Sequence, residues 1–202
     1  MAGNRSEQFV DLIRHGEPEG GNLLRGSKDD PLSDTGWQQM RAAVARHEPW
    51  DVIVSSPLRR CAEFAAELAE RHGVTLEVEP NLREIAFGDW EGRTYRELTD
   101  STPHAFQAFF RDPLNNTPPN AEPLSDFASR IHTAWDAVTA RHARSHILIV
   151  SHGAVMRALY CRVTNMPLES LFSIEVPYAC RGRIRRASEG DRLVYHNVGA
   201  CT

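Results

Sequence analysis

The chain has 202 residues, a formal net charge of −4 and charged side chains at 25% of positions. This length suits one well-buried core, and the apolar fraction of 41% is that of an ordinary globular protein. Without a strongly basic region, a nucleic acid or an anionic membrane is not expected as a partner. No apolar run reaches membrane-spanning length, and the opening residues, MAGNRSEQ, lack the apolar core of a signal peptide.

The first third of the chain alternates between strand and helix patterns. Residues 8–14 predict a strand that ends in a turn at Gly16. Ser33 is expected to cap a helix over 34–47, and residues 51–55 predict a second buried strand.

A second helix and a third strand are expected next. Ser56 followed by Pro57 indicates an N-cap and a proline in the first helical turn. The helix is expected to run to about residue 72, where Gly73 ends it, and residues 74–79 predict a strand by alternation.

The second half carries the clearest strand pattern of the chain, at residues 146–150. Gly153 then opens a helix that is expected to reach about residue 163. Three stretches near the C-terminus predict further strands, some of them antiparallel: 171–176, 182–187 and 192–196.

Alternating strands and helices predict an α/β fold, in which a mostly parallel central sheet is covered by helices on both faces. Between residues 93 and 124 several prolines break the pattern. We expect a helical insertion there, lying as a cap over the active-site edge of the sheet, rather than a linker. The chain is therefore expected to form one domain over residues 1–202.

Chemically active side chains gather at the predicted carboxyl ends of strands or just beyond them, where open parallel sheets bind ligands. The segments are Arg14-His15-Gly16-Glu17, Ser56-Pro57-Leu58-Arg59-Arg60, Leu82-Arg83-Glu84 with Phe87-Gly88, and Ser151-His152-Gly153. Guanidinium groups match phosphate oxygens, imidazole can act as a nucleophile, and a carboxylic acid can protonate a departing alcohol. This combination suits phosphoryl transfer.

These segments resemble those of the histidine phosphatase superfamily, which includes the cofactor-dependent phosphoglycerate mutases. The likeness runs from Arg14 to about Arg157. It rests on the Arg-His-Gly motif in order with SSPLRRCAEFA, LREIAFGDWEG and VSHGAVMRAL.

The resemblance implies a phosphomonoester hydrolase with a phosphohistidine intermediate. By that likeness His15 is the nucleophile and Glu84 is the proton donor. Arg14, Arg60 and His152 hold the phosphoryl oxygens and complete the catalytic set. No metal or other cofactor is expected, because the arginines supply the positive charge.

The resemblance also implies a substrate-binding set: Arg14, Gly16, Asn22, Arg25, Gly26, Arg60, Gly153 and Ala154. One departure concerns two phosphate ligands of the family, a threonine and an asparagine, whose positions hold Pro18 and Gly21 here. Asn22 is the candidate to replace the missing contact. Arg25 stands where relatives often carry glutamine, which adds a cation near the substrate.

Within the superfamily, LLRGSKDDPLSDTGWQQM with FGDWEGRT is most similar to the alpha-ribazole phosphatases. Those enzymes remove a 5′-phosphate late in cobalamin nucleotide-loop assembly, so a small phosphorylated metabolite is the expected partner. A phosphoglycerate mutase is the nearest alternative, but mutases of this type are longer. A silent phospholigand-binding module is disfavoured because every chemical position is filled.

Two further choices concern cations. Arg59 and Arg60 compete for the phosphate role, and the family spacing of four from Ser56 favours Arg60. A metal site is conceivable from His15, His47, His152 and Glu84. The flanking arginines argue against it, because they would repel a divalent cation.

Aromatic residues of the LREIAFGDWEG segment and of the insertion could stack on a flat leaving group or form the core under the insertion. They are Phe87, Trp90, Tyr95, Phe106, Phe109 and Phe110. Arg181, Arg183 and Arg185 alternate, which predicts the solvated face of a strand, although Arg181 could reach a substrate.

The four cysteines are far apart and form no CxxC pair (Cys61, Cys161, Cys180 and Cys201). Such spacing is typical of reduced thiols, not of a disulfide framework or a zinc site. We therefore expect a cytoplasmic protein. The sequence leaves open whether the chain forms a homodimer.

Overall fold

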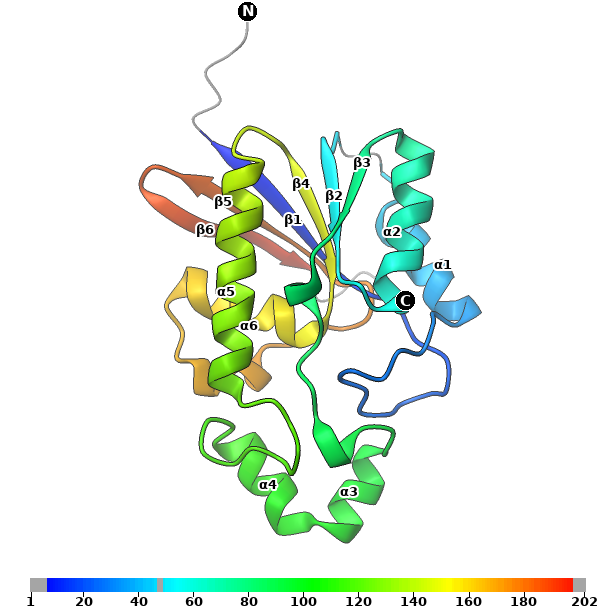
Figure 1. The fold of residues 1–202 in the computed structure, drawn as a ribbon, viewed down its shortest axis with the longest axis vertical. Helices are drawn as coiled ribbons and strands as arrows, with labels where there is room; N and C mark the ends of the chain where they lie inside the picture. The colour runs from blue at the N-terminus through cyan, green and yellow to red at the C-terminus, as the bar shows by residue number, and fades with distance from the viewer. Residues whose placement is uncertain (1–6, 47–48, 198–202) are drawn as a thin grey trace, which may run out of the picture.

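A six-stranded sheet in the order β3-β2-β4-β1-β5-β6 forms the centre of the molecule (Figure 1). The computed structural model describes residues 7–46 and 49–197. The strands are β1 (Gln8–Arg14), β2 (Val52–Ser55), β3 (Thr75–Val78), β4 (Ile147–Ser151), β5 (Arg181–Ala187) and β6 (Gly190–Asn197). The first four pair in parallel, whereas β5 and β6 are antiparallel. The predicted mostly parallel sheet is confirmed.

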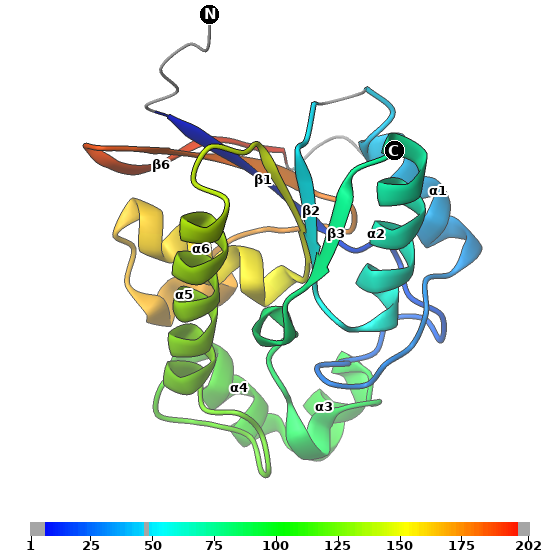
Figure 2. The ribbon, with the colours of Figure 1, turned by 45° about the horizontal axis from the view of Figure 1, so that its top comes forward.

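Helices cover both faces of the sheet (Figure 2). One face carries α1 (Asp34–Ala43) and α2 (Arg59–His72), and the other carries α5 (Leu124–Arg141) and α6 (Gly153–Thr164). The two faces follow from alternation along each strand. In β2, Val52 and Val54 pack in the core with α5 and α6, whereas Ile53 packs in the core with α1 and α2.

The segment 93–124 contains two short helices, α3 (Tyr95–Ser101) and α4 (Pro103–Arg111). They lie beyond the sheet, at the bottom of the view in Figure 1. Three short 3-10 segments connect the larger elements: η1 (Pro80–Leu82), η2 (Gly88–Trp90) and η3 (Leu168–Ser173). The long helix α5 was not predicted from the sequence. Its Phe127, Ile131 and Trp135 are fully buried against the sheet.

The predicted N-cap at Ser56 is wrong. Helix α2 begins at Arg59, and its N-cap, Leu58, makes no side-chain capping bond. The Ser56 hydroxyl instead lies 2.7 Å from Nε2 of His152 and accepts a bond from the Leu58 N–H at 3.3 Å. The predicted end at Gly73 is confirmed, because Gly73 adopts the left-handed conformation with a φ of 64°.

The predicted strand at 171–176 is also wrong. The chain forms η3 there, and Leu171 and Phe172 both pack into the core beneath α5 and α6. In a strand, successive side chains would face opposite sides of the sheet. Because Leu171 and Phe172 pack against the same apolar core, a tight helical turn fits this segment better than a strand.

The alternating arginines of β5 do not form a solvated face. Arg183 donates from its NH2 group to the fully buried carboxylate of Asp11 at 2.8 Å, and Arg181 lies 3.5 Å from it. Burial alone would raise the pKa of Asp11, but hydrogen bonds from Arg183, His146 and Trp50 lower it well below its usual range. These ion pairs hold β5 to β1 and keep Arg181 away from any substrate.

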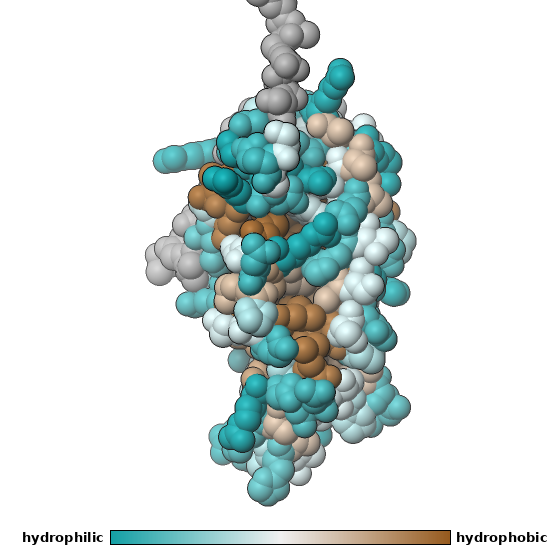
Figure 3. All heavy atoms as spheres, turned by 90° about the vertical axis from the view of Figure 1, so that its left-hand side faces the viewer, coloured by the Kyte–Doolittle hydropathy of each residue, from teal (hydrophilic) through white to brown (hydrophobic). Residues whose placement is uncertain are grey.

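No helix in the described ranges combines the length and apolar character that a bilayer span requires. Figure 3 shows one side of the molecule as mostly hydrophilic, with apolar residues in small separate patches.

Two glycines bring the turn after β1 against α1. A Cβ on Gly16 would lie 2.3 Å from the carbonyl oxygen of Gly36, and a Cβ on Gly36 would lie 2.1 Å from that of Glu17. Ser33 caps α1 by accepting a bond from the Gly36 N–H at 3.0 Å. The turn that follows His15 is therefore fixed by backbone-to-backbone contact.

This contact reverses the usual effect of replacing a helical glycine. Alanine normally stabilises a helix interior relative to glycine, by about 1 kcal/mol. We expect Gly36→Ala to lower the free energy of unfolding by about 1–3 kcal/mol instead, since the methyl group meets backbone that cannot yield. Urea unfolding measures the effect, with the exposed Gln38→Ala as the control. A stabilised Gly36→Ala would contradict the close approach.

Candidate active site

A cavity of about 200 Å³ opens where the carboxyl end of β1 meets the first turn of α6. It brings together side chains from all four predicted segments. Nine of the predicted site residues line it: Arg14, His15, Asn22, Arg25, Gly26, Arg60, Glu84, Gly153 and Ala154.

His15 directly follows the first strand and lies almost fully buried, with 4% of its surface exposed. Its Nδ1 lies 2.8 Å from the carbonyl oxygen of Gly16. A carbonyl can only accept, so Nδ1 carries the proton and Nε2 keeps a free lone pair. Burial, together with the positive charges of Arg14 and Arg60, lowers the pKa of His15 well below its usual value. The ring is thus a neutral base with Nε2 available.

Arg14 and Arg60 flank this ring with incompletely used donors. Arg14 donates to the carbonyl of Val176 at 2.6 Å and stacks over the ring of Tyr178, with its Cζ 4.2 Å from the ring centroid. Arg60 donates to the carbonyls of Gly26 and Lys28 at 2.8 and 2.7 Å. The Nε of each arginine is buried without an acceptor in the described part of the chain. A phosphoryl group would supply such acceptors.

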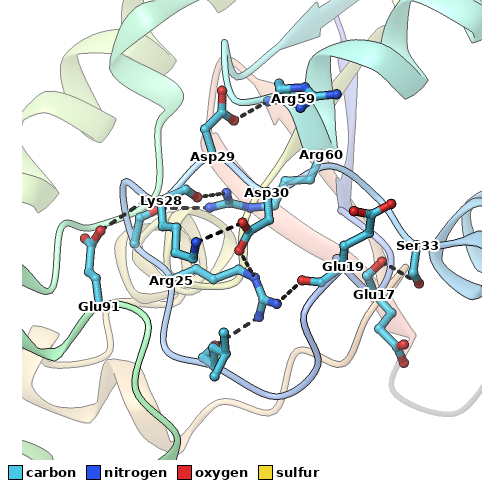
Figure 4. Close-up of polar contacts among 12 residues, drawn as sticks. Glu17, Glu19, Arg25, Lys28, Asp29, Asp30, Ser33, Arg59, Arg60 and Glu91 are labelled. Atoms are coloured by element: carbon cyan, nitrogen blue, oxygen red, sulfur yellow. Dashed lines mark hydrogen bonds and ion pairs between the residues drawn. The ribbon is translucent and has the colours of Figure 1, made fainter.

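Arg25 lines the cavity, but its guanidinium is engaged within its own loop. It forms an ion pair with Asp30 at 3.0 Å and donates to the carbonyls of Leu23 and Glu19 (Figure 4). Its charge is therefore offset locally. We propose that Arg25 shapes this loop rather than holding substrate.

Of two further candidate phosphate ligands, Asn22 lines the cavity and Arg59 does not. Arg59 is exposed, pairs with Glu63 at 2.7 Å and does not line the cavity. Asn22 stands at the cavity, and its side-chain amide makes no hydrogen bond to other described residues. We propose that this amide contacts the phosphate in place of the family ligands missing at Pro18 and Gly21.

Among the described residues, Glu84 is the only acidic side chain that lines the cavity. Its carboxylate accepts bonds from the backbone N–H groups of Ile85 and Ala154, at 3.1 and 3.3 Å. Arg130 holds the backbone of this loop, with bonds to the carbonyls of Arg83 and Glu84 at 2.8 and 3.0 Å. Arg130 was missed in the sequence because its helix, α5, was not predicted.

His152 and Gly16 do not line the cavity. The His152 ring is fully buried behind His15, with 5.2 Å between the ring centroids. Burial and the charge of Arg60 lower the pKa of His152 well below its usual value. Gly16 contributes its carbonyl to His15 and its close packing to α1. A direct phosphate contact by either residue stays a prediction.

The cavity has a second, largely aromatic side. Phe87, Tyr95, Phe110, Phe172 and Tyr178 line it. Trp90 and Phe109 are buried in the core instead, and Phe106 packs against that core. Phe87, Tyr95 and Phe110 are therefore placed to stack on a leaving group, whereas Trp90, Phe106 and Phe109 form the core under the insertion. Phe172 was placed in a strand that the structure does not form, and Tyr178 lies in a segment without a regular pattern, so neither residue was expected at the site.

Arg157 also lines the cavity and was not predicted as a site residue. It stands four residues after Gly153 in α6, so helical spacing from the Ser-His-Gly motif could have indicated it.

The structure offers no assembled metal site in its described ranges. No three side chains of histidine, cysteine, aspartate or glutamate there are grouped as metal ligands. His47, one member of the conceivable set, lies outside the described residues.

A buried neutral histidine between arginines, with one carboxylate at the same sheet edge, is an arrangement suited to phosphoryl transfer. The family model of the histidine phosphatase superfamily (branch 1) matches residues 10–199, and the chain belongs to this family. The resemblance and the phosphatase class predicted from the sequence are confirmed.

Three relatives show the range of the family near this chain. Adenosylcobalamin/alpha-ribazole phosphatase of Salmonella typhimurium is 33% identical over 173 residues, covering 84% of this chain and 86% of the relative. Phosphoserine phosphatase 1 of Hydrogenobacter thermophilus is 31% identical, with 80% and 79% covered. The structure of mycobacterial glucosyl-3-phosphoglycerate phosphatase has a TM-score of 0.82 at 25% identity, with 97% and 100% covered.

The low pKa of His15 makes stability depend on pH. Below about pH 6.5 the unfolded chain protonates this ring and the folded chain does not. The free energy of unfolding therefore falls with falling pH, by about 1.4 kcal/mol per unit for this residue.

We expect His15→Asn to lose about 1.4 kcal/mol less stability than the wild type between about pH 7.5 and about pH 5.5, because the variant lacks this buried ring. Urea unfolding at the two pH values measures the losses, and the exposed His104→Asn should behave as the wild type does. Equal losses in all three proteins would show that His15 is not held neutral.

Proposed function

We propose that this phosphatase hydrolyses small phosphate monoesters through a phosphohistidine formed at Nε2 of His15. The observation that carries the proposal is the hydrogen bond from Nδ1 of His15 to the Gly16 carbonyl at 2.8 Å, in a buried ring flanked by arginines. It leaves one nitrogen unprotonated and facing the cavity's cationic end.

In the first step, Nε2 of His15 forms a bond to phosphorus while the bond to the ester oxygen breaks in line with it. Glu84 gives its proton to the departing alcohol. Arg14 and Arg60 neutralise the equatorial oxygens, and the N-terminus of α6 adds partial positive charge.

In the second step, water attacks the phosphohistidine and returns the imidazole to its neutral form. Glu84 takes the proton from this water. The arginines offset the charge in both steps, so the mechanism requires no metal ion. Water replaces a second substrate hydroxyl, which distinguishes this reaction from that of a mutase.

The leaving group is proposed to be a small metabolite. The alpha-ribazole phosphatase among the relatives suggests alpha-ribazole phosphate, and the aromatic side of the cavity supports a flat leaving group. The buried free thiols of Cys61 and Cys161 support a cytoplasmic place of action.

Removal of the nucleophile tests the proposal directly. We expect His15→Ala to abolish turnover and the labelling of the protein by a phosphate-labelled monoester, because no nitrogen remains to take the phosphoryl group. Labelling is measured after rapid quenching, with and without a chelator, and the chelator should have no effect. Continued formation of an acid-labile phosphoprotein in the variant would rule out His15.

A second comparison separates Glu84 from the arginines. An alkyl alcohol leaves poorly without a proton, whereas nitrophenolate leaves well unaided. We expect Glu84→Gln to reduce turnover of a sugar phosphate much more than turnover of nitrophenyl phosphate. Arg60→Ala should reduce both to a similar extent, by about 2.7–4 kcal/mol in activation free energy. Equal losses on the two esters in Glu84→Gln would show that the carboxylate only supports the cavity.

A further inference from the structure

Arg157 lines the active-site cavity with most of its donors unused. Its Nε donates to the carbonyl of Ile174 at 2.7 Å, which fixes the guanidinium plane. No other described residue accepts a bond from its two terminal nitrogens, and the group is half-buried at the cavity wall. A guanidinium placed and left open in this way is a preformed half of a bidentate anion contact.

The position of Arg157 differs from that of the two phosphate-binding candidates. Its side chain turns back along α6, as helical side chains do, so that NH1 lies 2.9 Å from where a Cβ on Gly153 would stand. Its anchor, Ile174, follows the η3 segment that supplies Phe172 to the aromatic side of the cavity. Arg60 is anchored by a different segment, the loop that contains Gly26.

Arg157 meets the same first turn of α6 as Glu84, the proposed proton donor to the leaving group, because NH1 of Arg157 lies beside Gly153 and the Glu84 carboxylate accepts a bond from the Ala154 N–H at 3.3 Å. In-line displacement places the departing oxygen on the far side of phosphorus from Nε2 of His15. Burial lowers the pKa of Arg157 and the nearby carboxylate of Glu84 raises it, so the guanidinium stands within electrostatic reach of the proton donor.

The charges in the cavity do not balance without a further anion. Four arginines line it, and Arg25 pairs with Asp30, whose carboxylate also pairs with Lys28. A phosphate monoester carries a charge of about −1.5 to −2 and offsets Arg14 and Arg60. Glu84 is neutral when it acts as the proton donor. The charge of Arg157 then has no counterpart, unless the leaving group supplies one.

We propose that Arg157 is a specificity-determining residue that binds a carboxylate on the leaving group, so that the substrate is the phosphate ester of a hydroxy acid. The assignment rests on the proposed hydrolysis at His15 and narrows its substrate class. This assignment replaces the alpha-ribazole phosphate suggested by one relative, because an uncharged nucleoside would leave the guanidinium of Arg157 unpaired and would bind less well.

Two esters of the same chain length test this assignment. 3-Phosphoglycerate and glycerol 3-phosphate differ only in a carboxylate that is replaced by a hydroxymethyl group. In the wild type we expect a higher kcat/KM for 3-phosphoglycerate. Arg157→Gln should lower that value by about ten- to hundredfold, while the value for glycerol 3-phosphate should change by less than about threefold.

Two further variants serve as comparisons. Arg157→Lys keeps the charge and should restore part of the preference for the carboxylate. Arg162→Gln on the same helix removes an arginine that pairs with Asp136 at 2.7 Å outside the cavity, and it should leave both esters unchanged. Should Arg157→Gln fail to fold, inhibition of the wild type decides: glycerate should compete with nitrophenyl phosphate, and glycerol should not.

Equal losses on both esters in Arg157→Gln would overturn the assignment, because Arg157 would then contact the transferred phosphoryl group or support the fold. No loss on either ester, or no competition by glycerate, would overturn it as well. Failure of the proposed function is recognised separately. In that case the wild type would release phosphate from neither ester, or His15→Ala would still release it.

Discussion

The hydrogen bond from His15 to the carbonyl of Gly16 is the contact on which the chemistry of this site depends. It fixes the proton on Nδ1 and leaves Nε2 as the nucleophile. The carbonyl is held in turn by the packing of Gly16 on Gly36, where neither residue leaves room for a side chain. A contact between two glycines therefore sets the tautomer of the histidine that follows the first strand.

The surrounding positive charges keep His15 unprotonated, and this arrangement lowers the stability of the fold. Burial between Arg14 and Arg60 disfavours a protonated His15, so the ring stays neutral where a free histidine would begin to charge. The Nε of each arginine is buried without an acceptor among the described residues, which is unfavourable. A bound phosphoryl group would satisfy these donors, so part of the cost is recovered when substrate binds. Such strained polar groups are expected at functional sites.

The sequence was sufficient to predict site residues that stand next to a clear secondary-structure pattern. His15 and Arg14 follow a clear buried strand, and topology alone brings such strand ends to one edge of the sheet. Residues that depend on tertiary packing could not be predicted. Ser56 looks like a helix cap, but its hydroxyl meets His152, 96 positions along the chain. Tyr178 lies in an irregular segment, and it reaches the cavity only because the turn before β5 packs against the turn after β1.

The position of the phosphoryl group on the ring of His15 tests the central claim most directly. The protein would be mixed with a phosphate monoester, quenched in alkali within its turnover time, and examined by phosphorus–nitrogen correlated NMR after labelling of the histidine ring. The hydrogen bond to Gly16 predicts phosphorylation at Nε2 of His15 alone. Phosphorylation at Nδ1, or on any residue other than His15, would contradict the account.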